Sequence, residues 1–443
     1  MSDPHTRRQI LRAGALGGAL VAAALATLVL SATAAAKPPA AVPAPPLPLA
    51  TPESQGMSSE RLGRMHAEIE RFVNEGKHAG AISLIARNGK IVDWRTYGKR
   101  DLEGGLPMEK DTICRIYSMS KIVTSVAVLS LLEEARFRLD DPVGDYLPEL
   151  ARMKVLTGGT PEKPLLADTK GPITIRHLLT HTSGLTYDFG DGTIDKIFRE
   201  VKPFDASSLG EFVQRASRLP LAHEPGERFT YGVSTDVLGA LVEKVSGRSL
   251  AELLEERVWR PLGMKDTGFG VPEAKRARLA KVYEKGPDGK LQPVKRLLER
   301  EPVPVPKLLS GGGGLFSTTG DYARFMQMLL NGGQLDGVRI LSPKTVQLMM
   351  ANHLILASRP TLGDDPATGF GLGGAVRVDL AKGSTLGSVG QFGWSGMATT
   401  YANLDPRERT VAILFVQHLP YDEHKIFWRF STLFYQAITD SEE

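Results

Sequence analysis

An almost unbroken apolar run, IYSMSKIVTSVAVLSLLEE, covers residues 116–134. It contains neither Gly nor Pro, so it predicts a helix, and a helix that is hydrophobic on most faces is normally buried. Three polar residues interrupt its start: Ser118, Ser120 and Lys121. Burying a lysine costs free energy unless a partner or a change of protonation compensates. The pattern therefore predicts a specific role for Lys121.

Strand-like patterns occupy both ends of the remaining sequence, and helical periodicity occupies its middle. Two β-rich runs flank Asn88-Gly89, a pair that favours the positive φ values of a two-residue hairpin. The pattern is mostly helical from about 118 to 300, returns to strands over 369–418, and ends in an amphipathic helix over roughly 423–438. We therefore predict an α/β (α+β) fold. One antiparallel sheet, built from both chain ends and flanked by helices, would carry an inserted, mainly helical lobe.

The N-terminus has the pattern of a targeting segment. Arg7 and Arg8 precede an Ala/Leu/Gly run from 13 to 30, and small residues follow as far as Ala36. This arrangement resembles a twin-arginine export signal, so we expect residues 1–36 to be an export signal and the protein to be periplasmic. The alternative is a permanent membrane anchor, because a run of this length can just span a bilayer. Membrane contact is expected only through this segment, if it stays uncleaved.

A Pro/Ala-rich segment, residues 37–55, follows the signal and predicts an extended linker. No internal repeat and no second Pro-rich break divides the rest of the sequence. We therefore expect one domain over 56–440, with the helical lobe at about 118–300 inserted in the sheet lobe.

Composition and charge exclude several classes of function. The formal net charge of +4 is small for 443 residues, and no basic block lies outside the N-terminus, so nucleic-acid binding is not expected. The single cysteine, Cys114, excludes intrachain disulfides and thiolate metal clusters. The sequence has no HExxH string or comparable His cluster, and the nearest string, His223-Glu224-Pro225, is broken by its proline. We expect neither a metal nor an organic cofactor.

Ser118 and Lys121 lie three residues apart, which places them on one face of the predicted helix. A serine hydroxyl is a weak nucleophile and needs a base within hydrogen-bond reach. A lysine in apolar surroundings loses part of its preference for the charged form and can serve as that base. Taken alone, however, the spacing favours a helix start with a snorkelling lysine.

Further blocks change this interpretation, because several of them occur in the order found in one family. Over roughly residues 56–435 the sequence resembles the penicillin-recognising serine hydrolases: class C β-lactamases, D,D-peptidases and especially the β-lactamase-like family VIII carboxylesterases. The blocks are SMSK (118–121), ITIRHLLTHTSGL (173–185), EPGERFTYGVSTDVLG (224–239), RPLGMKDTGF (260–269), SGGGGLFST (310–318) and GFGLG (369–373). The resemblance implies that Ser118 is the nucleophile and Lys121 its base.

A second family motif, Tyr-x-Asn, is matched by Tyr231-Gly232-Val233. The resemblance implies that the phenol of Tyr231 relays protons to and from the reacting groups. Without the resemblance, Tyr231 would be taken for a loop tyrosine that fills an interface. Val233 replaces the asparagine whose amide holds the amide side chain of a β-lactam, which weakens the antibiotic interpretation and leaves an ester interpretation intact.

The third motif, Lys-Thr-Gly on a strand beside the nucleophile, is matched by Trp394-Ser395-Gly396. The cation that would bind a β-lactam carboxylate is absent, and a tryptophan here is similar to the carboxylesterase branch. It would supply an apolar wall and an indole N–H for substrate, unless it is an ordinary strand aromatic. The backbone N–H groups of Met397 and Ser118 would form the oxyanion hole.

Two other features are assigned structural roles. His181, in THTSGL, is expected to cap or pack beside the turn at Ser183-Gly184, and GGGG (311–314) is expected to allow close backbone approach near the site. No Gly-x-Ser-x-Gly nucleophile elbow occurs in the sequence, so an α/β-hydrolase is disfavoured.

The combined prediction is a serine hydrolase that forms an acyl-enzyme, acting as a carboxylesterase on short-chain or small-molecule esters through Ser118, Lys121 and Tyr231. Three alternatives remain: a β-lactamase or D,D-peptidase-like amide hydrolase, an acyltransferase that uses an alcohol in place of water, and a non-catalytic cell-wall-ligand sensor. The expected partner is a small-molecule ester or amide. The sequence gives no prediction for the natural ester or the oligomeric state.

Overall fold

The protein is described from a computed structural model, which covers residues 46–298, 306–354, 357, 360–363 and 365–441. The expected export signal and the linker up to residue 45 lie outside these ranges. Within them, the helices are all too short or too polar to pass through a bilayer.

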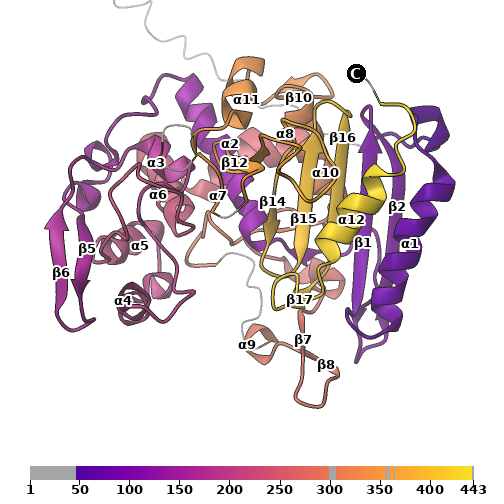
Figure 1. The fold of residues 1–443 in the computed structure, drawn as a ribbon, viewed down its shortest axis with the longest axis horizontal. Coiled ribbons are helices and arrows are strands. Elements are labelled where there is room, and N and C mark those ends of the chain that lie inside the picture. Colours follow the sequence, from indigo (N-terminus) through magenta and orange to yellow (C-terminus); the bar gives the residue numbers. More distant parts are fainter. Residues whose placement is uncertain (1–45, 299–305, 355–356, 358–359, 364, 442–443) are drawn as a thin grey trace, which may run out of the picture. The chain divides into compact units, whose positions relative to one another are not determined.

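One antiparallel sheet of eight strands, counted over the described ranges, joins the two ends of the domain (Figure 1). Its strands are β1 Gly80–Arg87, β2 Lys90–Asp101, β3 Leu106–Pro107, β12 Thr368–Phe370, β13 Ala375–Arg377, β14 Phe392–Gly396, β15 Thr400–Asp405 and β16 Thr410–Phe415. Their order is β12-β13-β14-β15-β16-β1-β2-β3. Ile82 of β1 lies opposite Phe415 of β16, so the predicted sheet from both chain ends is confirmed. The hairpin predicted at Asn88-Gly89 joins β1 to β2.

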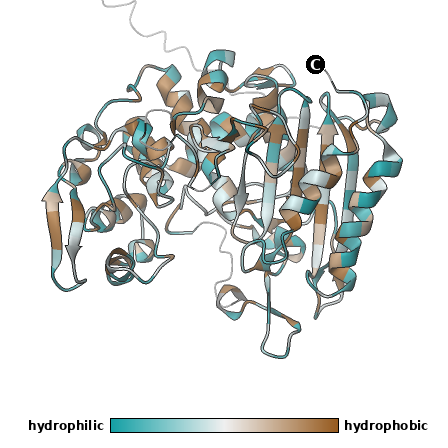
Figure 2. Ribbon diagram, viewed as in Figure 1, coloured by the Kyte–Doolittle hydropathy of each residue, from teal (hydrophilic) through white to brown (hydrophobic). Residues whose placement is uncertain are grey.

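Two helices from opposite ends of the sequence cover one face of this sheet, α1 (Ser59–Asn74) and α12 (Ile426–Tyr435). The Ser58 side chain caps α1 by accepting a hydrogen bond from the Arg61 N–H at 3.2 Å. Met65 of α1 and Phe430 of α12 share one hydrophobic cluster with β1. Figure 2 shows long hydrophobic stretches on the central strands and mixed polarity along α1, as expected for a helix with one buried face.

The opposite face packs against α10 (Thr319–Leu330), and α2 (Ser120–Glu133) belongs to the same hydrophobic cluster. Every residue of α2 from Ser120 to Leu131 is buried, which confirms the burial predicted from the apolar run. The α-helix begins later than that run, because Tyr117 takes a positive φ of 42°. A 3₁₀ turn, η3 (Tyr117–Met119), therefore precedes α2 and contains Ser118.

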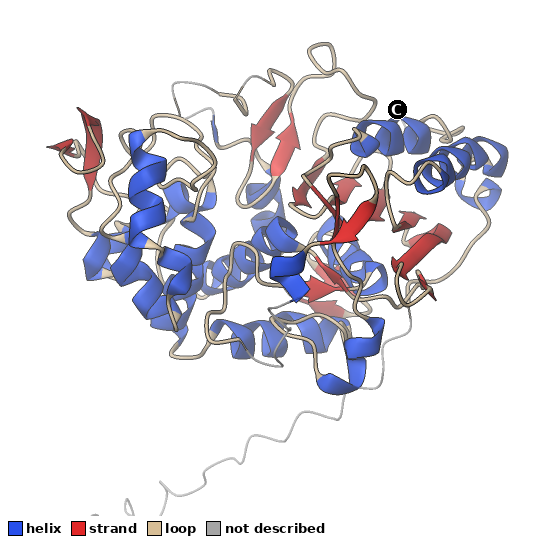
Figure 3. Ribbon diagram, turned by 90° about the horizontal axis from the view of Figure 1, so that it is seen from below, coloured by secondary structure: helices blue, strands red, loops and turns tan. Residues whose placement is uncertain are grey.

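The inserted lobe is mainly helical, as predicted, and Figure 3 shows it as a group of short helices beside the strands. It also contains two hairpins that the pattern analysis missed, because their short strands carry little hydrophobic alternation. The hairpins are β5 (Lys154–Gly159) with β6 (Pro164–Asp168), and β7 (Tyr283–Lys285) with β8 (Leu291–Pro293). The lobe helices are α3 Ile175–Leu179, α4 Thr193–Val201, α5 Leu209–Ala216, α6 Ser234–Ser246, α7 Leu250–Leu254, α8 Arg260–Leu262 and α9 Lys295–Leu298.

The remaining elements are short and connect the lobe to the sheet. They are β4 Cys114–Arg115, β9 Phe316–Ser317, β10 Gln334–Leu335, β11 Val338–Arg339, α11 Pro343–Met350 and β17 His418–Leu419. β4 pairs with β9, and β17 pairs in parallel with β7. The first of these pairings brings the chain before Ser118 beside the chain that follows the GGGG segment, and so sets the geometry of the site.

Candidate active site

Ser118 lies in η3, at the point where the chain leaves β4 and enters α2. The turn is held on both sides, since the Ile116 N–H donates to the Leu315 carbonyl at 3.1 Å and the Tyr322 hydroxyl donates to the Met119 carbonyl at 3.0 Å. Ser118 itself is only half-buried. Its hydroxyl is therefore fixed in place and still accessible to a small molecule.

Lys121 is fully buried, one turn further along. Its Nζ donates to three oxygens: Ser118 Oγ at 3.3 Å, Tyr187 OH at 3.1 Å and Gly312 O at 2.7 Å. An ammonium group has three donors, so each finds an acceptor here. The structure thus brings the predicted pair, Ser118 and Lys121, within hydrogen-bond distance.

Two tyrosine rings complete the surroundings of Lys121. Its Nζ lies 4.6 Å from the centre of the Tyr231 ring and 5.4 Å from that of the Tyr187 ring. The face of an aromatic ring attracts a cation, and more strongly where water is excluded. The rings therefore offset part of the cost of burying the amine.

Tyr231 lies just before α6 and contacts two of the other predicted site residues. Its hydroxyl accepts a hydrogen bond from the indole N–H of Trp394 at 3.2 Å, and its ring faces Lys121. Val233, two residues later, is fully buried in the core. It therefore offers no side-chain surface to a substrate.

Trp394, in the middle of β14, is part of the site as well as of the sheet. Its ring packs edge-on against Phe370, with centroids 5.2 Å apart, and lies 5.5 Å from the Tyr231 ring. The interpretation as an ordinary strand aromatic is therefore incomplete, because the indole N–H is bonded to the Tyr231 hydroxyl.

Gly396, the last residue of β14, allows this strand to lie against the start of η3. A Cβ atom at Gly396 would lie only 2.3 Å from the Ile116 carbonyl oxygen, so a larger residue would push the strand away. Met397 follows at the start of a turn with its side chain exposed, and the Ser395 hydroxyl is bonded to the Tyr421 hydroxyl at 2.7 Å. The predicted oxyanion strand therefore ends beside the turn that holds Ser118.

Tyr187 is a site residue that the sequence analysis missed. Burial, and then the nearby Asp236 carboxylate, hold the pKa of its phenol well above the usual range, so the hydroxyl stays neutral while bonded to Lys121. It follows the THTSGL block by two residues. An aromatic residue so close to this Gly-containing turn is the feature of the sequence that could have indicated Tyr187 as a site residue.

The buried Asp236 carboxylate fixes the backbone oxygen that Lys121 contacts. Its Oδ1 accepts hydrogen bonds from Ser310 Oγ at 2.6 Å and from the Gly312 N–H at 3.1 Å. Burial raises the pKa of Asp236, and the positive charge of Lys121 opposes that shift. A Cβ atom at Gly312 would lie 2.5 Å from Asp236 Oδ2, so the GGGG segment does allow the close approach that was predicted.

His181 has the packing role that its sequence position suggested. It is almost fully buried, and its Nδ1 accepts a hydrogen bond from the Gly232 N–H at 3.4 Å. Its ring lies 4.9 Å from that of Tyr231, and burial drives its pKa well below the usual range. His181 is therefore a neutral ring that supports Tyr231.

The chain is similar to known proteins over most of its length. The Beta-lactamase family model matches residues 65–432. Esterase EstB of Burkholderia gladioli is 32% identical, over 75% of this chain and 84% of that protein. Acyltransferase mokF of Monascus pilosus is 31% identical, over 75% and 81% respectively. The structure of unliganded Simvastatin Synthase from Aspergillus terreus superposes with a TM-score of 0.73 at 27% identity, covering 85% of this chain and 98% of that one.

Proposed function

Because the chain belongs to the beta-lactamase family, we propose that it is a serine hydrolase that works through an acyl-enzyme, with carboxylesterase activity on short-chain or small-molecule esters. The observation that carries the proposal is the 3.3 Å contact between Lys121 Nζ and the accessible Ser118 hydroxyl. The similarity to an esterase over most of the chain supports the choice of an ester as substrate.

The first half of the proposed reaction forms the acyl-enzyme. Ser118 Oγ attacks the carbonyl carbon of the ester while the Lys121 amine, which must first give up one proton of its ammonium form, accepts the Ser118 proton. The negative charge that develops on the carbonyl oxygen is stabilised by the backbone N–H groups of Ser118 and Met397. When the intermediate collapses, the alkoxide leaves with a proton that returns through Tyr231.

The second half releases the acid. Water attacks the acyl-enzyme while Lys121 and Tyr231 transfer protons in the opposite direction, and Ser118 regains its hydroxyl proton. Tyr187 and the Gly312 carbonyl would hold Lys121 in position throughout, since both are bonded to its Nζ from outside the helix. The first direct test is a burst of p-nitrophenol from p-nitrophenyl butyrate, followed by steady turnover. A protein without either phase would instead be a non-catalytic sensor of cell-wall ligands.

Replacing Tyr231 by phenylalanine is expected to lower kcat for p-nitrophenyl butyrate by about 10²–10⁴-fold, the usual contribution of a proton-transfer group. The ring that faces Lys121 remains, so the melting temperature should change little. Tyr146→Phe is the matched control, because the Tyr146 hydroxyl is bonded to Asp141 in the lobe. Equal rates for the Tyr231 variant and the unmodified enzyme would assign Tyr231 a packing role only.

Apolar groups at the surface beside Lys121 and Trp394 favour an ester over an antibiotic as substrate. Phe189 is 73% exposed and its ring lies 5.0 Å from that of Tyr187; Tyr421 and Met397 are also exposed, at 52% and 38%. Such a surface tolerates many acyl chains and discriminates weakly among them. Position 394 carries a tryptophan and therefore supplies no cation for the carboxylate of a β-lactam.

We therefore expect kcat/KM for p-nitrophenyl butyrate to exceed that for a chromogenic cephalosporin by at least about 100-fold. Trp394→Lys should shift this ratio toward the cephalosporin, and Trp394→Phe should not, because only lysine adds a charge. Trp394→Phe also reports the effect of losing the bond to Tyr231. A preference of the unmodified enzyme for the cephalosporin would identify a β-lactamase or D,D-peptidase-like hydrolase.

A second candidate function is acyl transfer to an alcohol, which the same acyl-enzyme permits. The similarity to an acyltransferase at 31% identity favours keeping this candidate. Turnover in the presence of increasing concentrations of a primary alcohol distinguishes the two, because transfer yields the new ester and hydrolysis yields the free acid.

We also propose that the protein is exported, which N-terminal sequencing of a periplasmic fraction would test.

A further inference from the structure

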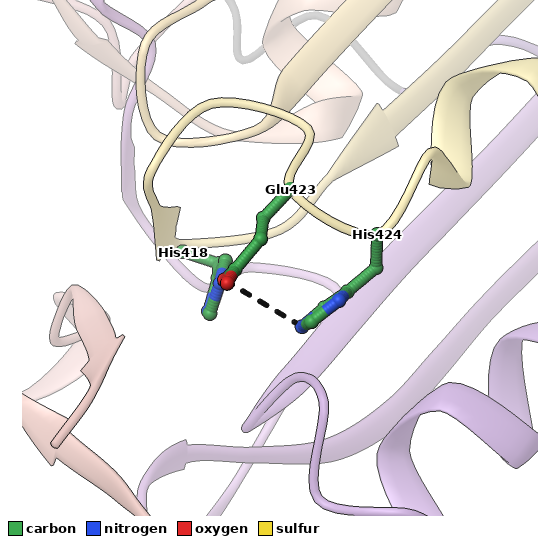
Figure 4. Close-up of side chains that lie close together, drawn as sticks. All are labelled: His418, Glu423 and His424. Atoms are coloured by element: carbon green, nitrogen blue, oxygen red, sulfur yellow. Dashed lines mark hydrogen bonds and ion pairs between the residues drawn. The ribbon is translucent and has the colours of Figure 1, made fainter. Parts of the chain in front are cut away.

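Three potential metal ligands lie together at the end of the sheet that carries β17. They are His418 in β17 and the adjacent pair Glu423 and His424, in the loop that leads to α12 (Figure 4). One ligand atom from each lies within 4.8 Å of the other two. No local His string in the sequence indicates this group, because it forms only where the loop turns back on β17.

The distances within this group are close to those around a zinc ion. Glu423 Oε2 lies 2.8 Å from His418 Nε2 and 3.7 Å from His424 Nε2. Two ligand atoms bound at about 2.0–2.1 Å to one tetrahedral zinc ion lie about 3.3 Å apart. Small side-chain movements would therefore place all three on one ion.

His78, from the turn between α1 and β1, provides an independent observation. Its side chain is almost completely buried, and neither ring nitrogen has a hydrogen-bond partner among the described residues. Its ring centre lies 4.9 Å from that of His418 and 5.3 Å from that of His424, while Phe72 stacks on it at 5.5 Å. A buried polar group without a partner is costly, so a missing ligand at this place would account for it.

The charged groups around the site leave it with little net repulsion for a cation. Lys77 and Lys285 are the positively charged side chains near the group, and Lys77 is paired with Glu75 at 2.7 Å. Glu284 adds a negative charge on the side of His418. Glu423 and His424 are partly exposed and give an ion a route from solvent.

We propose that His418, Glu423 and His424 bind one zinc ion, and that a water in the fourth position is hydrogen-bonded to His78. Three protein ligands and one water are a usual zinc coordination. The proposed ligands are not among the residues placed around Ser118, and the ion would cross-link the segment 418–424. That segment is tied to the turn after β14, because the Thr399 hydroxyl donates to the His418 carbonyl at 3.0 Å and accepts from the Asp422 N–H at 3.1 Å.

The test is calorimetric titration of zinc chloride into the full-length chain, produced without an affinity tag and freed of metal. We expect one zinc ion per chain and a raised melting temperature. His424→Ala and Glu423→Gln should each weaken zinc binding by more than about 100-fold, and His78→Phe, which keeps the stacking on Phe72, by about 10–100-fold.

His66→Ala is the matched control, because His66 Nε2 is bonded to Asp93 at 2.9 Å in a comparable His–carboxylate pair outside the group. It should bind zinc as the unmodified chain does. Equal zinc binding by the unmodified chain and by His424→Ala would overturn the proposal, as would loss of binding in the His66 variant. Because the readouts are stoichiometry and melting temperature, a failure here leaves the esterase proposal untouched.

Discussion

Ester turnover is expected to fall by about 10⁴-fold or more when Ser118 is replaced by alanine, because the variant has no nucleophile for the acyl-enzyme. The fold should survive. The lost hydroxyl is half-buried, and Lys121 keeps its bonds to Tyr187 and Gly312. The measurements are kcat with p-nitrophenyl butyrate and the melting temperature. The free energy of unfolding should fall by at most about 1 kcal/mol, the contribution of one hydrogen bond, so the melting temperature should change little.

Covalent labelling identifies the nucleophile independently of turnover. After incubation with a fluorophosphonate, mass spectrometry should place one adduct on the peptide that carries Ser118. Ser130→Ala is the control, because Ser130 lies further along α2 with its hydroxyl bonded to the Ala127 carbonyl; this variant should keep both label and turnover. A label on Ser183 or Ser395 would contradict the assignment.

The second large effect is expected for Lys121→Arg, which should be almost as damaging as Lys121→Ala, at about 10²–10⁴-fold in kcat. Arginine keeps the positive charge but does not lose its proton in a protein, so it cannot take the proton of Ser118. The burst phase should disappear together with steady turnover, because the step that fails is acylation.

Lys110→Arg is the matched control for this prediction. Lys110 Nζ lies 5.1 Å from the centre of the Trp94 ring, a cation–π contact like that of Lys121 but outside the site. Near-native turnover in Lys121→Arg would mean that Lys121 contributes only charge and packing. Circular dichroism of both arginine variants separates lost chemistry from lost folding, since the position of Lys121 is fully buried.

The features that could be predicted from sequence are those set by neighbouring residues. The hairpin at Asn88-Gly89 depends on local φ preferences, and the buried helix depends on an apolar run without Gly or Pro. The Ser118–Lys121 contact follows from a spacing of three residues across one turn. Sheet formation from both chain ends could be inferred because strand patterns occur only there.

The features that could not be predicted depend on contacts between distant segments. Lys121 is held by Tyr187 and by the Gly312 carbonyl, and no local pattern relates these positions to each other. The orientation of Val233 into the core depends on how α6 packs, so a motif match alone could not reveal it. His78 meets His418 only because β1 lies in the same sheet as the C-terminal strands.

The pairing of β1 with β16 has a consequence for how the domain assembles. Ile82 finds its partner Phe415 only after almost the whole chain has been synthesised. Native contacts between such distant residues raise the contact order, and the loop entropy must be lost before those contacts form, which slows folding. A nascent chain can therefore form α2, which carries Lys121, early, but the proposed site is complete only when the C-terminal strands dock and bring Trp394 and Met397 beside η3 and Ser118.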